Sequence, residues 1–310
     1  MSRKNTARVV GCLGGLYEVV TESGERLFCK ARGAFRHEDT RVLVGDFVCL
    51  VSASDGSTVI DEIAERKNAL IRPRLANLDH LTAVLSVKNP LPMPDTLDKL
   101  LAICHHNAID VSLVLTKSDL TDRQAPTVDA DCPPLDELYR NAGYSVFLLS
   151  SATGEGVDDY RRFALDRLSR GETLAFAGAS GVGKSTLLNA LFPSLACETG
   201  GVSEKISRGR HTTRAVSLFS QDGGYIADTP GFSMLDFLRF DFFSLEDLPL
   251  NFPEIAARIG ECRYADCSHT AEEGCAVLTA VREGLIAPSR HRSYASLYEI
   301  LRQKKRDSYK

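Results

Sequence analysis

The sequence lacks long apolar runs, sustained heptads and a strong excess of one charge. No apolar run in its 310 residues approaches the roughly 18 that a membrane-spanning helix needs, and the N-terminus leads into no signal-peptide core. We therefore expect a cytoplasmic protein with no membrane partner. A formal net charge of −4 argues against a uniformly basic nucleic-acid binder. Any RNA contact must use local patches, no DNA contact is expected, and the missing heptads favour a monomer.

Nine cysteines are present, an odd number that fits a reducing compartment better than a disulfide framework. Six are scattered in mostly apolar settings, where buried free thiols are the default: Cys12, Cys29, Cys49, Cys104, Cys132 and Cys197. The other three follow the spacing Cys262-x₄-Cys267-x-His269-x₅-Cys275. Cys₃His is a recurrent tetrahedral set for structural Zn²⁺, and metal would substitute for a core in so small a segment. The alternative is three unrelated thiols and a surface histidine.

One stretch fits the phosphate-binding pattern G-x-x-x-x-G-K-[ST]. Its glycines let backbone N–H groups turn around phosphate oxygens, Lys184 adds charge near the β- and γ-phosphates, and the Ser185 hydroxyl would ligate Mg²⁺. A buried strand at 173–177 and a helix at 186–192 flank it. The alternative is an ordinary glycine turn. The predicted nucleotide-binding residues here are Gly178, Ala179, Ser180, Gly181, Val182, Gly183, Lys184, Ser185 and Thr186.

The first 70 residues or so predict an all-β module of short segments separated by glycine-containing turns. The expected strands are Ala7–Cys12, Leu16–Val20, Arg26–Lys30, Phe47–Ser52 and Val59–Ile63. Five short strands suggest a small barrel of the OB-fold type, which often binds oligonucleotides. Basic residues that could contact RNA are Arg3, Lys4, Arg8, Lys30, Arg32, Arg36 and Arg41. Solvated surface explains any one of them equally well.

From Arg72 onward strands and helices alternate, which indicates an α/β domain. The expected elements are strands at 81–87, 111–115 and 145–149 and helices at 95–107, 134–141 and 156–168. The strand at 111–115 ends in Thr116, Lys117, Ser118 and Asp119, the [NT]-K-x-D pattern of guanine-specific NTPases. Asp119 would accept the ring N–H and the exocyclic amine of guanine, and Lys117 would brace the phosphate loop. Ser151 and Ala152 resemble the S-A-K element, whose backbone N–H meets the guanine O6.

Two further segments follow the phosphate loop. Residues 203–214 are polar and basic, as suits a switch whose threonine reaches Mg²⁺ and the γ-phosphate in the triphosphate state. Thr213 is slightly favoured over Thr212, and an ordinary surface loop is the alternative. A strand pair at 215–220 and 225–227 then ends in D-x-x-G. Its Asp228 would hold the Mg²⁺ shell through water, and the Gly231 N–H would sense the γ-phosphate.

The order of these elements is shuffled. A Ras-like chain begins with the phosphate loop, whereas here the segments at 116–119 and 151–153 precede it. Folding requires only that the same strands meet in one sheet. Joining the original chain termini and creating new termini elsewhere therefore preserves the site. The sequence therefore predicts a circularly permuted P-loop GTPase domain that binds GTP or GDP. Three parts are expected: the barrel at 1–70, the GTPase domain at 71–235, and a zinc-bound helical domain at 236–310.

The chain resembles the ribosome small subunit-dependent GTPase A family over nearly its whole length. The resemblance rests on the barrel, the segment 76–79, the permuted order, the segment 209–213 and the late cysteine cluster, which matches the family's zinc motif residue by residue. It implies GTP hydrolysis stimulated by the 30S subunit, a role in late maturation of that subunit, and contact with 16S rRNA. The alternatives are a GTP-gated RNA-binding module that barely hydrolyses GTP, and a permuted GTPase acting on another target.

Two features remain outside the motifs. Phe232 stands where Ras-like enzymes carry a water-orienting glutamine, so we expect slow intrinsic hydrolysis, with a catalytic group supplied by the ribosome or by the basic switch loop. His211 is one candidate, although a phosphate or RNA contact fits it better. Ser289 is expected to cap a final helix. Seven Lys/Arg residues from Arg290 onward suggest contact with rRNA phosphate, and a solvated tail is the alternative.

Overall fold

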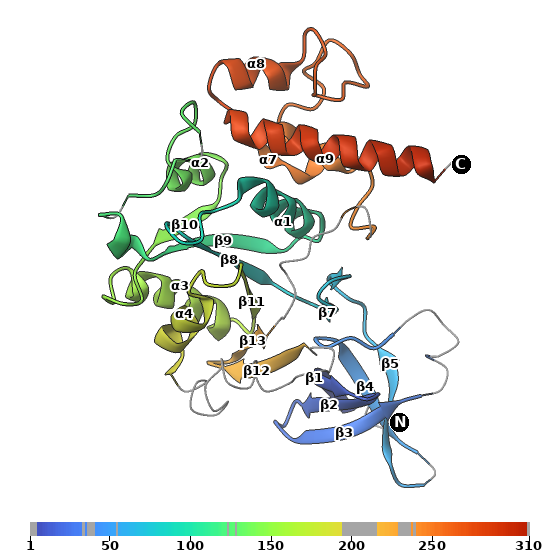
Figure 1. Ribbon diagram of the computed structural model, residues 1–310. Coiled ribbons are helices and arrows are strands. Elements are labelled where there is room, and N and C mark those ends of the chain that lie inside the picture. The colour runs from blue at the N-terminus through green and yellow to red at the C-terminus, as the bar shows by residue number, and fades with distance from the viewer. Residues whose placement is uncertain are drawn as a thin grey trace. The chain divides into compact units, whose positions relative to one another are not determined.

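The computed structural model describes residues 5–32, 35, 41–53, 55–122, 124–127, 129–193, 216–228, 237 and 240–308 (Figure 1). The chain divides into two compact units. One comprises Met1–His80, Arg162–Phe176 and Phe192–Phe232, and the other comprises Leu81–Arg161, Ala177–Leu191 and Ser233–Lys310.

The N-terminal strands close into a barrel, as the sequence predicts. Their order is β1-β2-β3-β5-β4, and their bounds are β1 Asn5–Leu13, β2 Leu16–Thr21, β3 Arg26–Ala31, β4 Phe47–Ser52 and β5 Thr58–Ile63. Alternate residues such as Val19, Val48 and Ile60 fill its core. This alternation of buried and outward side chains is what a small barrel needs, since one face of every strand lines the interior. The register shifts between Val9 and Gly11.

A two-stranded hairpin and a six-stranded sheet follow. The hairpin pairs β6, Ala69–Leu70, with β7, Leu75–Ala76, and no sequence pattern predicts it. The sheet has the order β10-β9-β8-β11-β13-β12. Its bounds are β8 His80–Ser86, β9 Asp110–Thr116, β10 Ser145–Leu148, β11 Thr173–Ala177, β12 Ser217–Gln221 and β13 Gly224–Asp228. Strand β9 pairs in parallel with β10, β11 pairs in parallel with β13, and β12 is antiparallel to β13.

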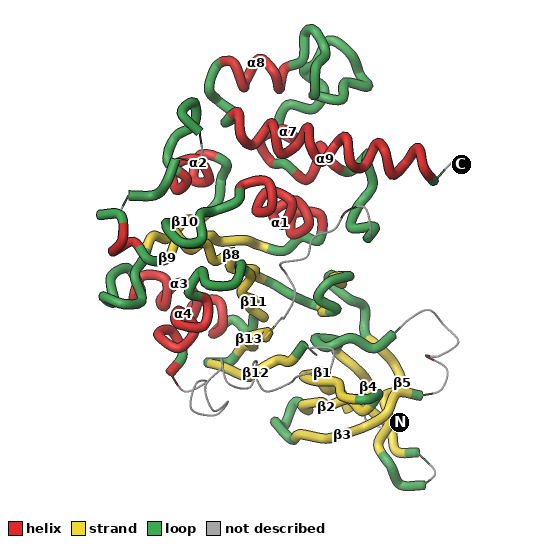
Figure 2. The backbone as a smooth tube through the Cα atoms, in the orientation of Figure 1, coloured by secondary structure: helices red, strands yellow, loops and turns green. Residues whose placement is uncertain are grey.

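The helices of the α/β part connect these strands (Figure 2). They are α1 Pro94–His106, α2 Leu135–Asn141, α3 Val157–Ser169 and α4 Lys184–Leu191, and a 3₁₀ turn, η2, lies at Ser118–Leu120. The predicted apolar stripe of α1 is buried, including Leu97, Leu101 and Cys104. The alternation of strand and helix confirms the α/β prediction.

The C-terminal region is helical. Its elements are η3 Leu248–Asn251, α7 Pro253–Ala256, α8 Ala276–Arg282 and α9 Pro288–Asp307. Helix α9 packs along α1, and the two lie side by side in Figure 1. The predicted Ser289 cap is wrong: Ala287 is the N-cap residue without a side-chain cap bond, and Pro288 opens the helix. Proline is favoured there because it has no N–H to satisfy. Among the described residues, no helix is both long and apolar enough to cross a bilayer.

Two arginines that the sequence suggests for RNA contact are buried instead. Arg290 is 2% exposed and pairs at 2.6 Å with both Asp98 and Glu254. Arg8 is 6% exposed and contacts neutral oxygens and aromatic rings. Neither guanidinium lies on the surface, because partners distant in sequence enclose it.

Candidate functional site

The phosphate-loop segment has a backbone shape that requires its glycines. It joins the buried strand β11 to helix α4, and residues 179–181 are exposed. Gly181 and Gly183 have φ angles of +82° and +93°, in the left-handed region that favours glycine. A Cβ added at Gly178 would lie 2.4 Å from the carbonyl oxygen of Val84. The loop therefore leaves no space for a side chain at one glycine and strains one at the other two.

Helix α4 begins directly after this loop, at Lys184. The Leu187 N–H donates to the carbonyl oxygen of Gly183 at 2.9 Å, which starts the helical hydrogen-bond ladder. First-turn N–H groups of an α-helix have no acceptor within the helix, and together with the helix dipole they favour an anion. The loop and this helix end are chemically suited to a phosphate, with the Ser185 hydroxyl in the first turn.

The segment at the end of β9 adjoins the phosphate loop. Thr116 Oγ1 lies 2.5 Å from the carbonyl oxygen of Val182 and 3.0 Å from that of Leu85. Lys117 has φ of +62°, and its Nζ donates to the carbonyl oxygen of Gly181 at 2.7 Å and to that of Asn89. The structure thus brings together two predicted segments that are 64 residues apart at this contact.

The predicted base-recognition residues gather at the ends of β9 and β10. The Ser118 N–H donates to the carbonyl oxygen of Leu149 at 3.2 Å, which connects the two strand ends. Ser150 Oγ accepts from the Ala152 N–H, also at 3.2 Å. Ser151 Oγ is buried without a hydrogen-bond partner in the described part of the chain.

Asp119 follows in η2 and is exposed. Its carboxylate is accessible to a ligand, as a base-recognising group requires. Asn89, whose carbonyl oxygen accepts from Lys117, is a site residue that no sequence pattern signals, because every residue carries a backbone carbonyl.

The remaining predicted nucleotide residues are described only in part. Asp228 is the last residue of β13, as the D-x-x-G prediction requires of a strand end. Thr213 and Gly231 lie outside the described residues, and so do Thr212, His211 and Phe232. The switch assignments therefore stay predictions.

The late cysteines and histidine form one cluster. The ligand atoms of Cys262, Cys267, His269 and Cys275 all lie within 4.8 Å of one another. Cys262 Sγ is 3.9 Å from Cys275 Sγ and 3.5 Å from His269 Nδ1. A tetrahedral Zn²⁺ with Zn–S bonds of about 2.3 Å separates two sulfur ligands by roughly 3.8 Å. The donor set and its spacing therefore fit a structural zinc ion.

Hydrogen bonds and burial support this cluster. The Ala276 N–H donates to Cys262 Sγ at 3.3 Å, and the Leu278 N–H donates to Cys275 Sγ at 3.5 Å. Burial raises the pKa of the Cys267 thiol to about 12 and lowers the pKa of His269. Thiolates in such surroundings need a cation beside them, which a metal would supply.

Comparisons with known proteins agree with this geometry. The sequence model described as RsgA GTPase matches residues 63–238, and that of the RsgA N-terminal domain matches residues 6–60. The protein named small ribosomal subunit biogenesis GTPase RsgA from Moorella thermoacetica is 40% identical over 290 residues, covering 93% of this chain and 94% of the relative. Its namesake from Geobacillus sp. is 39% identical over 299 residues, covering 96% and 98%.

Solved structures share the fold. YjeQ from Thermotoga maritima superposes with a TM-score of 0.76 at 32% identity, covering 96% of this chain and 98% of that one. YloQ, described as a circularly permuted GTPase, gives a TM-score of 0.74 at 31% identity, covering 98% and 96%. Fold, motif order and sequence agree, and the chain belongs to the RsgA family of circularly permuted GTPases.

Proposed function

We propose that this chain binds GTP with Mg²⁺ at the phosphate loop, hydrolyses it to GDP and phosphate, and acts on the 30S ribosomal subunit during its late maturation. GTP hydrolysis is the activity of the family to which the chain belongs. The relatives' name, small ribosomal subunit biogenesis GTPase, supports the partner.

The contact between Lys117 and Gly181 carries the nucleotide proposal. A guanine-specific site needs its base-recognition and phosphate-binding segments within the span of one nucleotide. Lys117 belongs to the first segment, Gly181 to the second, and their 2.7 Å hydrogen bond joins the two. If the two motif matches were fortuitous, contact between these two segments would not be expected.

Each predicted residue takes a role suited to its chemistry. Lys184 and the loop N–H groups bind phosphate oxygens, Asp119 accepts two guanine donors, and Ser151 and Ala152 lie near the guanine O6. The Mg²⁺ ligands are oxygen donors, as this ion prefers. We assign them to Ser185, Thr213 and, through water, Asp228. The Gly231 N–H senses the γ-phosphate, whose loss on hydrolysis releases the switch.

The outer parts contact the ribosome. We propose a barrel at residues 1–70, a GTPase domain at 71–235 and a zinc-stapled helical domain at 236–310, with the outer two binding 16S rRNA. Exposed basic residues of the barrel, Lys30, Arg32 and Arg41, support the first contact. The Cys₃His cluster supports one zinc ion per chain. We expect a cytoplasmic monomer.

Phosphate release with and without purified 30S subunits tests this function. We expect slow release alone and an acceleration on the order of tenfold or more with the subunit, because Phe232 cannot orient the attacking water. Purified 50S subunits are the particle control, and Lys184→Ala, which removes the phosphate contact, is the protein control. Rapid release that 30S subunits leave unchanged would contradict the proposal. GTP binding without release under either condition would instead favour a GTP-gated RNA-binding module.

A further inference from the structure

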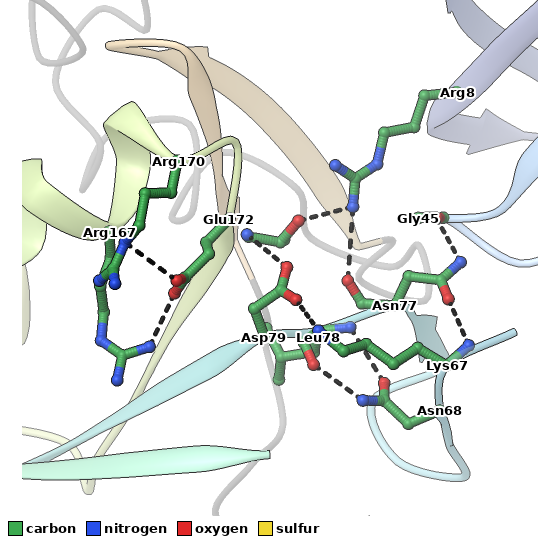
Figure 3. A network of polar contacts seen from close by, with 11 residues as sticks. Arg8, Gly45, Lys67, Asn68, Asn77, Leu78, Asp79, Arg167, Arg170 and Glu172 are labelled. Atoms are coloured by element: carbon green, nitrogen blue, oxygen red, sulfur yellow. Dashed lines mark hydrogen bonds and ion pairs between the residues drawn. The ribbon is translucent and has the colours of Figure 1, made fainter. Parts of the chain in front are cut away.

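The buried guanidinium of Arg8 connects the barrel to the strand that leads into the phosphate loop (Figure 3). Arg8 lies on β1 and donates through Nη2 to Thr173 Oγ1 at 2.5 Å and to the carbonyl oxygen of Asn77 at 3.4 Å. No carboxylate pairs with it within the described part of the chain. Both of its hydrogen-bond acceptors are neutral, so this buried charge is stabilised less than one in a salt bridge.

Two aromatic rings also lie against the guanidinium of Arg8. Its guanidinium carbon lies 4.8 Å from the centroid of Phe47, on the barrel strand β4, and 4.5 Å from that of Tyr225, on β13. Cation–π attraction of this kind favours one geometry of the planar guanidinium. Arg8 therefore contacts the barrel on one side and β11 and β13 on the other.

The two strand residues that Arg8 touches are register partners. Thr173 pairs with Tyr225 in the parallel ladder of β11 and β13. Strand β11 runs from Thr173 to Ala177 and enters the phosphate loop at Gly178, while β13 runs past Tyr225 to Asp228. A shift of this pair would therefore move the starting points of both nucleotide loops together.

A second set of contacts holds the same point of β11. Asp79 accepts from the Thr173 N–H at 2.8 Å, and its own N–H donates to the Thr173 carbonyl oxygen at 3.1 Å. Asn77, with φ of +55°, donates from its side chain to the carbonyl oxygen of Gly45 at 3.0 Å and accepts from the Lys67 N–H at 2.8 Å. The segment 76–79 thus contacts both Thr173 and the turn before β4, and its Asn77 carbonyl oxygen is the second acceptor of the Arg8 guanidinium.

We propose that Arg8 is a positioning residue that couples the barrel to the GTP site through the Thr173–Tyr225 pair. The inference rests on the proposed function. A force on the barrel passes through Arg8 to β11 and β13, and from them to the phosphate loop and D-x-x-G. Coupling between sites is reciprocal, so the γ-phosphate must change the barrel as the barrel changes the site.

Hydrogen exchange of the full-length chain tests this coupling without a ribosome. The amide of Val9 donates to Asp46 and that of Gly45 donates to Val9, so both report on the barrel. In the wild type we expect their exchange rates to change roughly fivefold when a β,γ-imido GTP analogue replaces GDP. In Arg8→Met the change should fall below about twofold, with the analogue's Kd within about threefold of wild type. Arg8→Lys, which keeps the charge but not the planar guanidinium that lies against the two rings, should be intermediate.

Two further variants isolate the effect. Thr173→Val removes the acceptor oxygen of Arg8 at nearly constant shape and should reproduce the loss even where Arg8→Met folds poorly. Arg26→Met removes an exposed barrel arginine that pairs with Glu18 and should keep the wild-type response. A wild-type response in both Arg8→Met and Thr173→Val overturns the inference. The inference is also overturned if the wild type binds the analogue and the exchange rates of the Val9 and Gly45 amides do not change. Failure of the wild type to bind the analogue refutes the proposed function itself, and the Kd from the same samples separates these cases.

Discussion

The Lys117 ammonium and the Gly181 carbonyl oxygen are 2.7 Å apart, although 64 residues separate them. Lys117 also donates to the carbonyl oxygen of Asn89, so one side chain joins three loops. Its left-handed backbone, with φ of +62°, turns the chain at the end of β9. Lys117 therefore stabilises the conformation of the phosphate loop through a hydrogen bond from the base-recognition segment.

Lys117→Met should weaken the binding of GTP and GDP alike, by about tenfold or about 1.4 kcal/mol. The phosphate loop loses its hydrogen bond from Lys117, while Asp119 keeps its contacts with the base. Fluorescent-nucleotide titration measures both values. Lys99→Met, on α1, removes a lysine that pairs with Asp95 and should change neither. A large loss of guanine selectivity in Lys117→Met would show that Lys117 acts on the base rather than on the loop.

Cys267→Ser should release close to one zinc ion per chain, since it removes one of four ligands of a closed site. Metal content by mass spectrometry and protease sensitivity beyond residue 240 measure the two consequences. Cys12→Ser, outside the cluster, is the matched control and should retain the zinc. Full metal content in Cys267→Ser would contradict the assignment.

Arg290→Met should lower the free energy of unfolding by about 3–5 kcal/mol, because it leaves the buried Asp98 carboxylate without its cation. Arg292→Met, two residues further on, removes an arginine that is 56% exposed and paired with Asp129, and should cost at most about 1 kcal/mol. Urea unfolding compares the two. Similar losses in the free energy of unfolding would mean that the buried ion pairs of Arg290 add no more stability than an exposed pair.

Local sequence patterns predicted most of the fold. The bounds of β4 and β11 match their predicted ranges, and the other long strands differ by a residue or two, because burial alternation and turn residues are local signals. No local pattern predicts the hairpin of β6 and β7, since strands of two residues have no period. Short helices such as α7 are equally hard to recognise.

Long-range burial could not be predicted. The sequence around Arg290 is typical of an exposed basic helix, whereas in the structure Arg290 is buried against Asp98, 192 residues earlier in the chain. Arg8 is likewise buried through contact with a residue far away in the sequence, Thr173. Within the candidate site, motif order indicated which segments should meet, whereas the Asn89 carbonyl had no sequence signal at all.

Nucleotide selectivity of Asp119→Asn shows whether Asp119 recognises the base of a nucleotide held by the phosphate loop. An amide in place of the carboxylate keeps one acceptor oxygen for the ring N–H but replaces the other with an N–H donor, which repels the exocyclic amine of guanine and suits xanthine, whose group at that position is a carbonyl. We expect at least about a hundredfold weaker GTP binding and a preference for XTP over GTP. Asp122→Asn, an identical change three residues on, should keep the wild-type preference for GTP. Unchanged GTP affinity in Asp119→Asn would contradict the claim that these shuffled segments enclose one guanine nucleotide.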